Sequence, residues 1–92
     1  MPGKILTLHP AGKPGVNIDQ DKYDFIKSAI LKTIREKREI SYQDLDKKLN
    51  QSLKGKFDGS ISWYVVTVKL DLEARNLIRR VPGTSPHKMT LA

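Results

Sequence analysis

The chain has 92 residues, of which 38% are hydrophobic and 29% charged, an ordinary mixture for one small folded domain. It lacks cysteine and has no apolar run near the roughly 20 residues of a membrane helix, so disulfides, cysteine zinc sites and membrane spans are excluded and a cytoplasmic protein is expected. Seventeen Lys and Arg residues against ten Asp and Glu residues give a net charge of +7, which favours an anionic partner such as nucleic acid but also suits simple solubility.

The first 18 residues are predicted to form an extended arm ahead of a domain that covers residues 19–92. Proline and glycine recur through residues 1–16, which predicts irregular backbone. The stretch from Lys4 to Leu8 is the one part of the arm that predicts a short strand.

A first helix is predicted from Gln20 to Lys37. Asn17 or Asp19 is placed to cap its N-terminus. Its apolar residues recur every three or four positions, which gives one buried face: Tyr23, Ile26, Ile30 and Ile34.

A second helix is predicted from Tyr42 to about Leu53. Ser41 and Asp44 resemble a capping box at its start, and the β-branched Ile40 just before it predicts a one-bridge strand. Its buried face is marked by Leu45, Leu49 and Leu53, whereas Asp46, Lys47, Lys48 and Asn50 are expected to face water.

A third helix is predicted from Ile61 to about Arg75, with Ser60 as its cap and Asn76 as a left-handed stop. Two strands then follow. They form a hairpin around a loop at residues 82–86, and their expected ranges are Leu77–Val81 and Lys88–Leu91.

The order helix, short strand, helix, helix, strand, loop, strand resembles the winged helix-turn-helix fold over about residues 19–92. The predicted fold is therefore α+β, a three-helix winged helix-turn-helix domain with a C-terminal β-hairpin wing and an N-terminal extended arm. The resemblance implies that the third helix lies in the major groove of DNA and that the wing contacts the backbone or the minor groove. Two segments, Trp63–Arg75 and Lys13–Ile18, are also similar to a small family of uncharacterised bacterial proteins regarded as winged helices, for which no activity is established.

The third helix is apolar on two sides, which conflicts with base recognition. Its core face comprises Ile61, Val65, Val68 and Leu72, and its opposite face comprises Trp63, Val66, Thr67, Leu70 and Ala74. Bases are recognised by Arg, Lys, Asn or Gln, yet the outer face offers only Thr67, with Ser62 and Lys69 beside it. Asp71 and Glu73 are expected near the phosphates, which they would repel.

A helix with two apolar sides is usually buried on both. Either the arm, through Ile5, Leu6 and Leu8, or a second copy of the chain is expected to cover the outer face. The interface residues predicted for a homodimer or another protein partner are Trp63, Val66 and Leu70.

The wing and the basic loops favour phosphate contacts without sequence recognition, because residues 76–92 contain three cations and no acid. An ordinary solvated hairpin explains the same charges. Arg79 and Arg80 are neighbours in a strand, so only one of them can share a face with His87 and Lys88. The candidate nucleic-acid contacts are Lys54, Lys56, Ser62, Thr67, Lys69, Arg79, Arg80, His87 and Lys88.

No catalytic or metal-binding constellation is recognisable in the sequence. His9 and His87 lie in separate segments beside prolines, and no helix carries histidine and carboxylate at ligand spacing. We therefore expect no enzyme, no cofactor and no metal. The leading hypothesis is a nucleic-acid-binding winged-helix protein, a transcriptional regulator or accessory factor; the alternative is a protein-interaction or dimerisation module.

Overall fold

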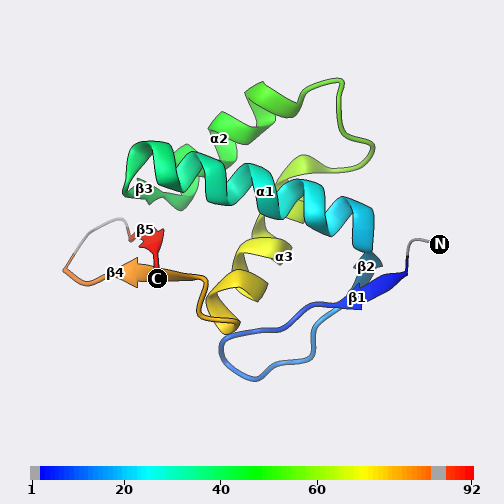
Figure 1. Cartoon of the computed structure of the whole chain (residues 1–92), viewed down its shortest axis with the longest axis horizontal. Coiled ribbons are helices and arrows are strands. Elements are labelled where there is room, and N and C mark those ends of the chain that lie inside the picture. Colours follow the sequence, from blue (N-terminus) through cyan, green and yellow to red (C-terminus); the bar gives the residue numbers. More distant parts are fainter. Residues whose placement is uncertain (1–2, 84–86) are drawn as a thin grey trace.

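The computed structural model describes residues 3–83 and 87–92, so residues 84–86 of the predicted hairpin loop lie outside it. Within this part the chain is an α+β protein in which three helices surround one core, as predicted, with two small antiparallel sheets (Figure 1). Its elements in chain order are β1 (Lys4–Leu6), β2 (Asn17–Asp19), α1 (Gln20–Lys37), β3 (Ile40–Ser41), α2 (Tyr42–Leu53), α3 (Ile61–Ala74), β4 (Ile78–Val81) and β5 (Lys88–Leu91).

The helix ends follow local capping chemistry. The Ser41 hydroxyl accepts a hydrogen bond from the Asp44 amide at 3.2 Å and so caps α2, and the Ser60 hydroxyl accepts one from the Trp63 amide at 3.3 Å and caps α3. Asp19 occupies the N-cap position of α1, but its side chain makes no capping bond to that helix. Asn76 has a φ of 63°, which confirms the predicted left-handed stop after α3.

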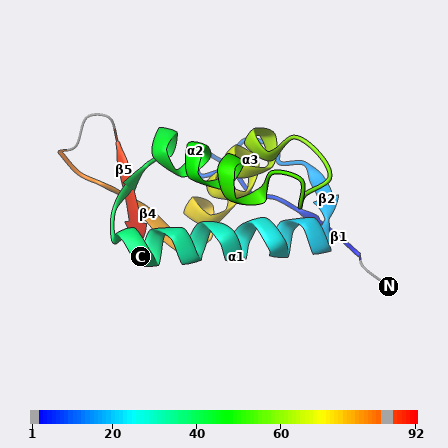
Figure 2. The same ribbon diagram turned by 90° about the horizontal axis from the view of Figure 1, so that it is seen from above.

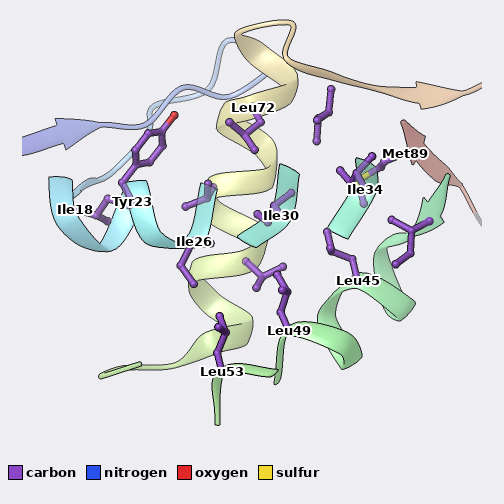
Figure 3. Packing of buried hydrophobic residues seen from close by; sticks show 14 residues of the cluster. Ile18, Tyr23, Ile26, Ile30, Ile34, Leu45, Leu49, Leu53, Leu72 and Met89 are labelled. Atoms are coloured by element: carbon purple, nitrogen blue, oxygen red, sulfur yellow. The ribbon is translucent and has the colours of Figure 1, made fainter. Parts of the chain in front are cut away.

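The core is formed by the faces that α1, α2 and α3 turn toward one another (Figure 3). Val65, Val68 and Leu72 of α3 are fully buried, as the predicted core face requires, whereas Ile61 lies half-buried at its edge. The remaining members of the buried cluster are Ile18, Tyr23, Ile26, Ile30, Ile34, Ile40, Leu45, Leu49, Leu53, Ile78 and Met89.

The two sheets lie at opposite ends of the molecule (Figures 1 and 2). One has the order β3-β5-β4, with Ile40 opposite Met89 and Arg80 also opposite Met89 on its other side. The hairpin thus forms as predicted, although β4 begins at Ile78 rather than at Leu77. The predicted short strand is also present, but it pairs through Ile40 and Ser41 instead of through one bridge. The other sheet pairs β1 with β2, a strand that the sequence did not lead us to expect.

The arm packs against the helices instead of extending freely. Ile5 packs against the core and Thr7 is buried, while Leu6 and Leu8 stay exposed. Alternation along the strand turns Ile5 and Thr7 inward. Of the three arm residues expected to cover the outer face of α3, only Leu8 lies beside that face, and it covers the face in part. The Thr7 and Val16 backbones join the two sides of the arm by an amide-to-carbonyl hydrogen bond of 2.9 Å.

Candidate functional site

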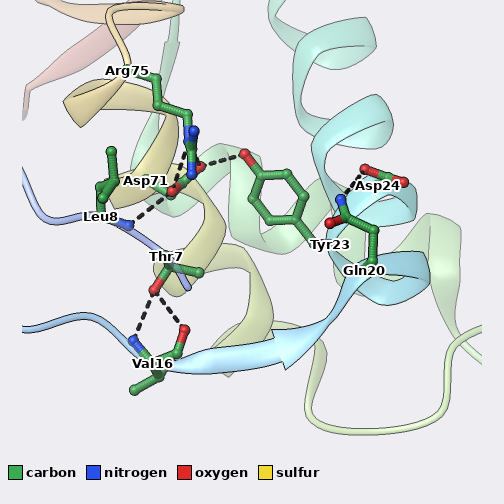
Figure 4. Close-up of polar contacts among 8 residues, drawn as sticks. All are labelled: Thr7, Leu8, Val16, Gln20, Tyr23, Asp24, Asp71 and Arg75. Atoms are coloured by element: carbon green, nitrogen blue, oxygen red, sulfur yellow. Dashed lines mark hydrogen bonds and ion pairs between the residues drawn. The ribbon is translucent and has the colours of Figure 1, made fainter. Parts of the chain in front are cut away.

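A buried carboxylate, Asp71, fastens the arm to α3 (Figure 4). Its side chain is completely buried and accepts hydrogen bonds from three directions. The Leu8 amide donates at 2.8 Å, the Arg75 guanidinium Nε at 2.9 Å and the Tyr23 hydroxyl through a short contact. These donors supply the partners that a buried charge needs.

This network corrects one expectation from the sequence. Asp71 was expected to face phosphates, but its charge is enclosed within the fold and offset by Arg75. Burial, followed by the hydrogen bond to Asp71, raises the pKa of Tyr23 well above its ordinary value of 10.0. The hydrogen bond to Asp71 likewise raises the pKa of Arg75. Asp71 and its donors therefore form a structural clasp.

The polar side of α3 that faces α2 is also engaged. The Ser62 hydroxyl donates to Asp46 at 3.2 Å and accepts from the Asn50 side-chain amide at 3.1 Å. Asp46 and Asn50 are half-buried between the two helices, so the expectation that they face water is wrong. The Ser62 hydroxyl is therefore engaged within the fold both as a donor and as an acceptor.

Lys69 lies in a similar position about two turns further along α3. Its residue is only 8% exposed, and its ammonium group lies 3.3 Å from Glu73 and 5.5 Å from the ring centroid of Tyr42. The same Glu73 oxygen accepts from the Arg80 guanidinium at 3.4 Å, which links α3 to β4. Glu73 is thus neutralised by two cations rather than presented to solvent as a free acid.

A hollow of about 280 Å³ opens between the start of α2, α3 and the β4–β5 hairpin. We call it the wing-side hollow. Three of the predicted nucleic-acid contacts, Lys69, Arg80 and His87, meet there. Its other described lining residues are Tyr42, Gln43 and Met89, none of them acidic, and burial followed by the nearby Asp46 charge raises the pKa of Tyr42.

A second hollow of about 290 Å³ lies on the other side of the first turn of α2, and we call it the lysine hollow. Lys88 of β5 meets Lys37 and Lys48 there, and these three cations outnumber the two carboxylates of Glu39 and Asp44. Lys37 and Lys48 were missed by sequence reasoning. They are distant in sequence, and only the pairing of β3 with β5 brings them beside Lys88.

The outer face of α3 forms the floor of a groove between the arm and β4. At one end Trp63, Thr67 and Leu70 face Leu8 and Val16 of the arm across about 170 Å³. At the other end a hollow of about 540 Å³ is lined by His9, Pro10, Ala11, Leu70, Glu73, Asn76, Ile78, Arg79 and Arg80. His9 and Leu70 line both parts, so we treat them as one feature and call it the arm groove.

The remaining predicted contacts lie elsewhere. Lys54 and Lys56 are exposed in the connection between α2 and α3, at the end of α2 away from the hairpin (Figure 1). Lys56 lines a separate hollow there with Lys22, Phe25, Phe57 and two aspartates. The nine candidate nucleic-acid residues therefore do not form one site.

Two negative observations apply to the described residues. No group of three or more histidine or carboxylate side chains in residues 3–83 and 87–92 is placed to hold a metal ion. None of the helices in this part of the chain has the length and hydropathy needed to cross a membrane.

These features define a small α+β protein with a basic surface beside α2 and a partly apolar groove beside α3. The chain belongs to the family of unknown function DUF6958, whose family model matches residues 4–89. No curated protein matches the sequence.

Proposed function

We propose that this protein is a winged-helix protein that binds nucleic acid through phosphate contacts without recognising its sequence. The observation that carries the proposal is the convergence of Arg80, His87 and Gln43 on the wing-side hollow, with the lysine hollow adjoining it across the first turn of α2. A regulator or accessory factor is the role that such binding suits.

The arrangement of elements supports the winged-helix assignment. A short strand between α1 and α2 joins the C-terminal hairpin in the order β3-β5-β4, so the hairpin is held beside the start of α2. In this assignment α3 is the recognition helix and β4–β5 is the wing. The first turn of α2 borders both hollows, through Gln43 beside Arg80 and through Asp44 beside Lys88, and the positive end of a helix attracts phosphate.

The side chains of α3 favour binding that is independent of sequence. Ser62 is bound to Asp46 and Asn50, and Lys69 is buried against Glu73. Neither is free to make the bidentate contacts by which bases are distinguished. Exposed cations can bind phosphates without any bidentate contact to a base, and this kind of binding makes the affinity strongly dependent on salt.

The test is binding of a fluorescently labelled duplex of mixed sequence, measured by anisotropy at several salt concentrations. Lys88→Glu and Arg80→Glu should each weaken binding, and the slope of log affinity against log salt should fall by about 1 for each phosphate contact that is lost. Lys32→Glu is the matched control, because it makes the same charge change at an exposed position of α1. Thermal unfolding of each variant confirms that its fold is retained.

The outcomes are distinct. Weaker binding in the hairpin variants with little change in Lys32→Glu supports the proposed surface. An equal loss of duplex affinity in all three variants shows that binding responds to net charge alone. That result removes the hairpin and the start of α2 as the binding surface. Failure of the unmodified protein to bind the duplex at low salt removes nucleic acid altogether.

A second candidate function is protein interaction through the outer face of α3, by a homodimer or another partner. Trp63 is 44% exposed there, and the neighbouring Leu70 is only half-covered although the arm lies alongside. Apolar surface of this kind marks interaction sites. Sedimentation of the purified chain tests self-association, and Trp63→Ala should dissociate any dimer that uses this face.

A further inference from the structure

The arm groove combines apolar walls with a basic end. Leu8, Val16 and Trp63, each more than 40% exposed, surround its narrow part. No described residue that lines this narrow part is acidic. A peptide segment bound in the narrow part of the groove therefore contacts mainly hydrophobic side chains.

The wide part of the groove carries the charge. Arg79 and Arg80 line it with Asn76 and His9. Its one acidic lining residue among those described is Glu73, which is already paired with Lys69 and Arg80. Arg79 is exposed on the neighbouring strand position, so the wide part keeps a net positive character.

The groove is formed before any partner arrives. The Leu8 amide donates a hydrogen bond to Asp71. Thr7 and Val16 are joined by two further bonds: the Thr7 amide donates to the Val16 carbonyl at 2.9 Å, and the Val16 amide donates to the Thr7 hydroxyl at 3.0 Å. A preformed wall reduces the entropy cost of ordering on binding. The arm is therefore a fixed side of the groove.

We infer that the arm groove binds an acidic, amphipathic peptide segment of another protein, with apolar side chains against Trp63 and Leu70 and carboxylates against Arg79. This inference rests on the second candidate function and names the partner chemistry for it. Charge complementarity decides between occupants. A second copy of this chain carries a net charge of +7 and would bring like charges together, which opposes association.

The experiment is a selection of displayed random peptides on the immobilised full-length chain. The library length is about 14 residues, because a helix of that length spans the roughly 21 Å of α3. Synthetic copies of the enriched peptides are then titrated, and the emission of Trp63 reports binding, since it is the single tryptophan of the chain.

Enriched peptides that pair acidic residues with regularly spaced apolar residues support the inference. Their affinity should fall at least tenfold in Arg79→Glu, which changes an exposed side chain, and remain within about twofold in Lys32→Glu. Trp63→Ala should weaken binding by a similar factor, measured by anisotropy of labelled peptide.

Other results overturn the inference in different ways. Enrichment of basic or uncharged peptides, or binding unaffected by both groove variants, refutes the acidic partner. A dimer that Trp63→Ala dissociates shows that a second copy occupies the groove, so the interaction function stands while this inference fails. A monomer that enriches no peptide refutes both.

Discussion

Replacement of Asp71 by alanine is the sharpest test of how this fold is held together. The substitution leaves the buried Tyr23 hydroxyl and the partly buried Leu8 amide without their acceptor. Each such loss costs about 1–3 kcal/mol, whereas the side chain of Arg75 is 35% exposed and regains water. We expect a total loss of about 3–4 kcal/mol in the free energy of unfolding.

A loss of this size is large compared with the total free energy of unfolding. A chain of this size has a stability of roughly 5–14 kcal/mol, so Asp71→Ala should remove a substantial fraction of it. Because Tm falls by about 4–8 °C per kcal/mol in small domains, the melting temperature should drop by about 12–30 °C. Urea and thermal unfolding followed by circular dichroism measure both quantities.

The control for Asp71→Ala is Asp24→Ala. Asp24 carries the same side chain on α1, but it is exposed and, among the residues that the structure describes, its carboxylate accepts a side-chain hydrogen bond from Gln20 alone. Its removal should therefore cost less than about 0.5 kcal/mol. A double-mutant cycle with Tyr23→Phe adds a second check, because Tyr23→Phe should cost little once Asp71 is gone. An Asp71→Ala protein within about 1 kcal/mol of the unmodified chain would refute the reasoning.

Three further predictions concern pH, the arm and a cap. Folding raises the pKa of Tyr23, so the folded protein keeps a hydroxyl proton that the unfolded chain releases near pH 10. The free energy of unfolding should therefore fall above pH 10, by up to about 1.4 kcal/mol for each pH unit. Tyr23→Phe should flatten this slope, which urea titrations at stepped pH measure. Gly15→Ala places a Cβ 1.6 Å from the Thr7 carbonyl oxygen, so hydrogen exchange at the Thr7 amide should accelerate while the core amides stay protected. Ser41→Ala removes the cap on the Asp44 amide and should cost about 1 kcal/mol by urea unfolding, a value near zero arguing against the cap.

Local signals in the sequence predicted the helices and the hairpin well. Regular apolar spacing located α1 and α2, and Ser41, Ser60 and Asn76 marked ends that the structure places at the same residues. The strand β2 was missed because Asn17 and Asp19 flank a single apolar residue, Ile18. Its pairing with β1 depends on tertiary contacts rather than on propensity.

The candidate site was harder to predict because its residues change role once they are paired. Lys69 and Asp71 are charged residues on an apolar helix, and helical periodicity alone placed them in solvent-facing positions. The spacing of Asp71 and Arg75, four residues apart, was the one available signal for their ion pair. Leu8 and Tyr23 are separated from Asp71 by 63 and 48 positions in the sequence. Helical periodicity describes neighbours within one helix and cannot predict contacts between residues so far apart in the chain.

The clasp at Asp71 also has a consequence for the order in which the chain folds. Closing the 63-residue separation between Leu8 and Asp71 directly from the unfolded chain carries an entropy cost of about 4 kcal/mol. Once α1 has packed on α3 and brought Tyr23 to Asp71, only the short stretch between Leu8 and Tyr23 remains to be closed. We therefore expect docking of the arm to be a late kinetic step and its release to be a local opening that leaves the three helices assembled. Each such opening removes one wall of the arm groove, so the Leu8–Asp71 contact contributes to keeping the groove formed.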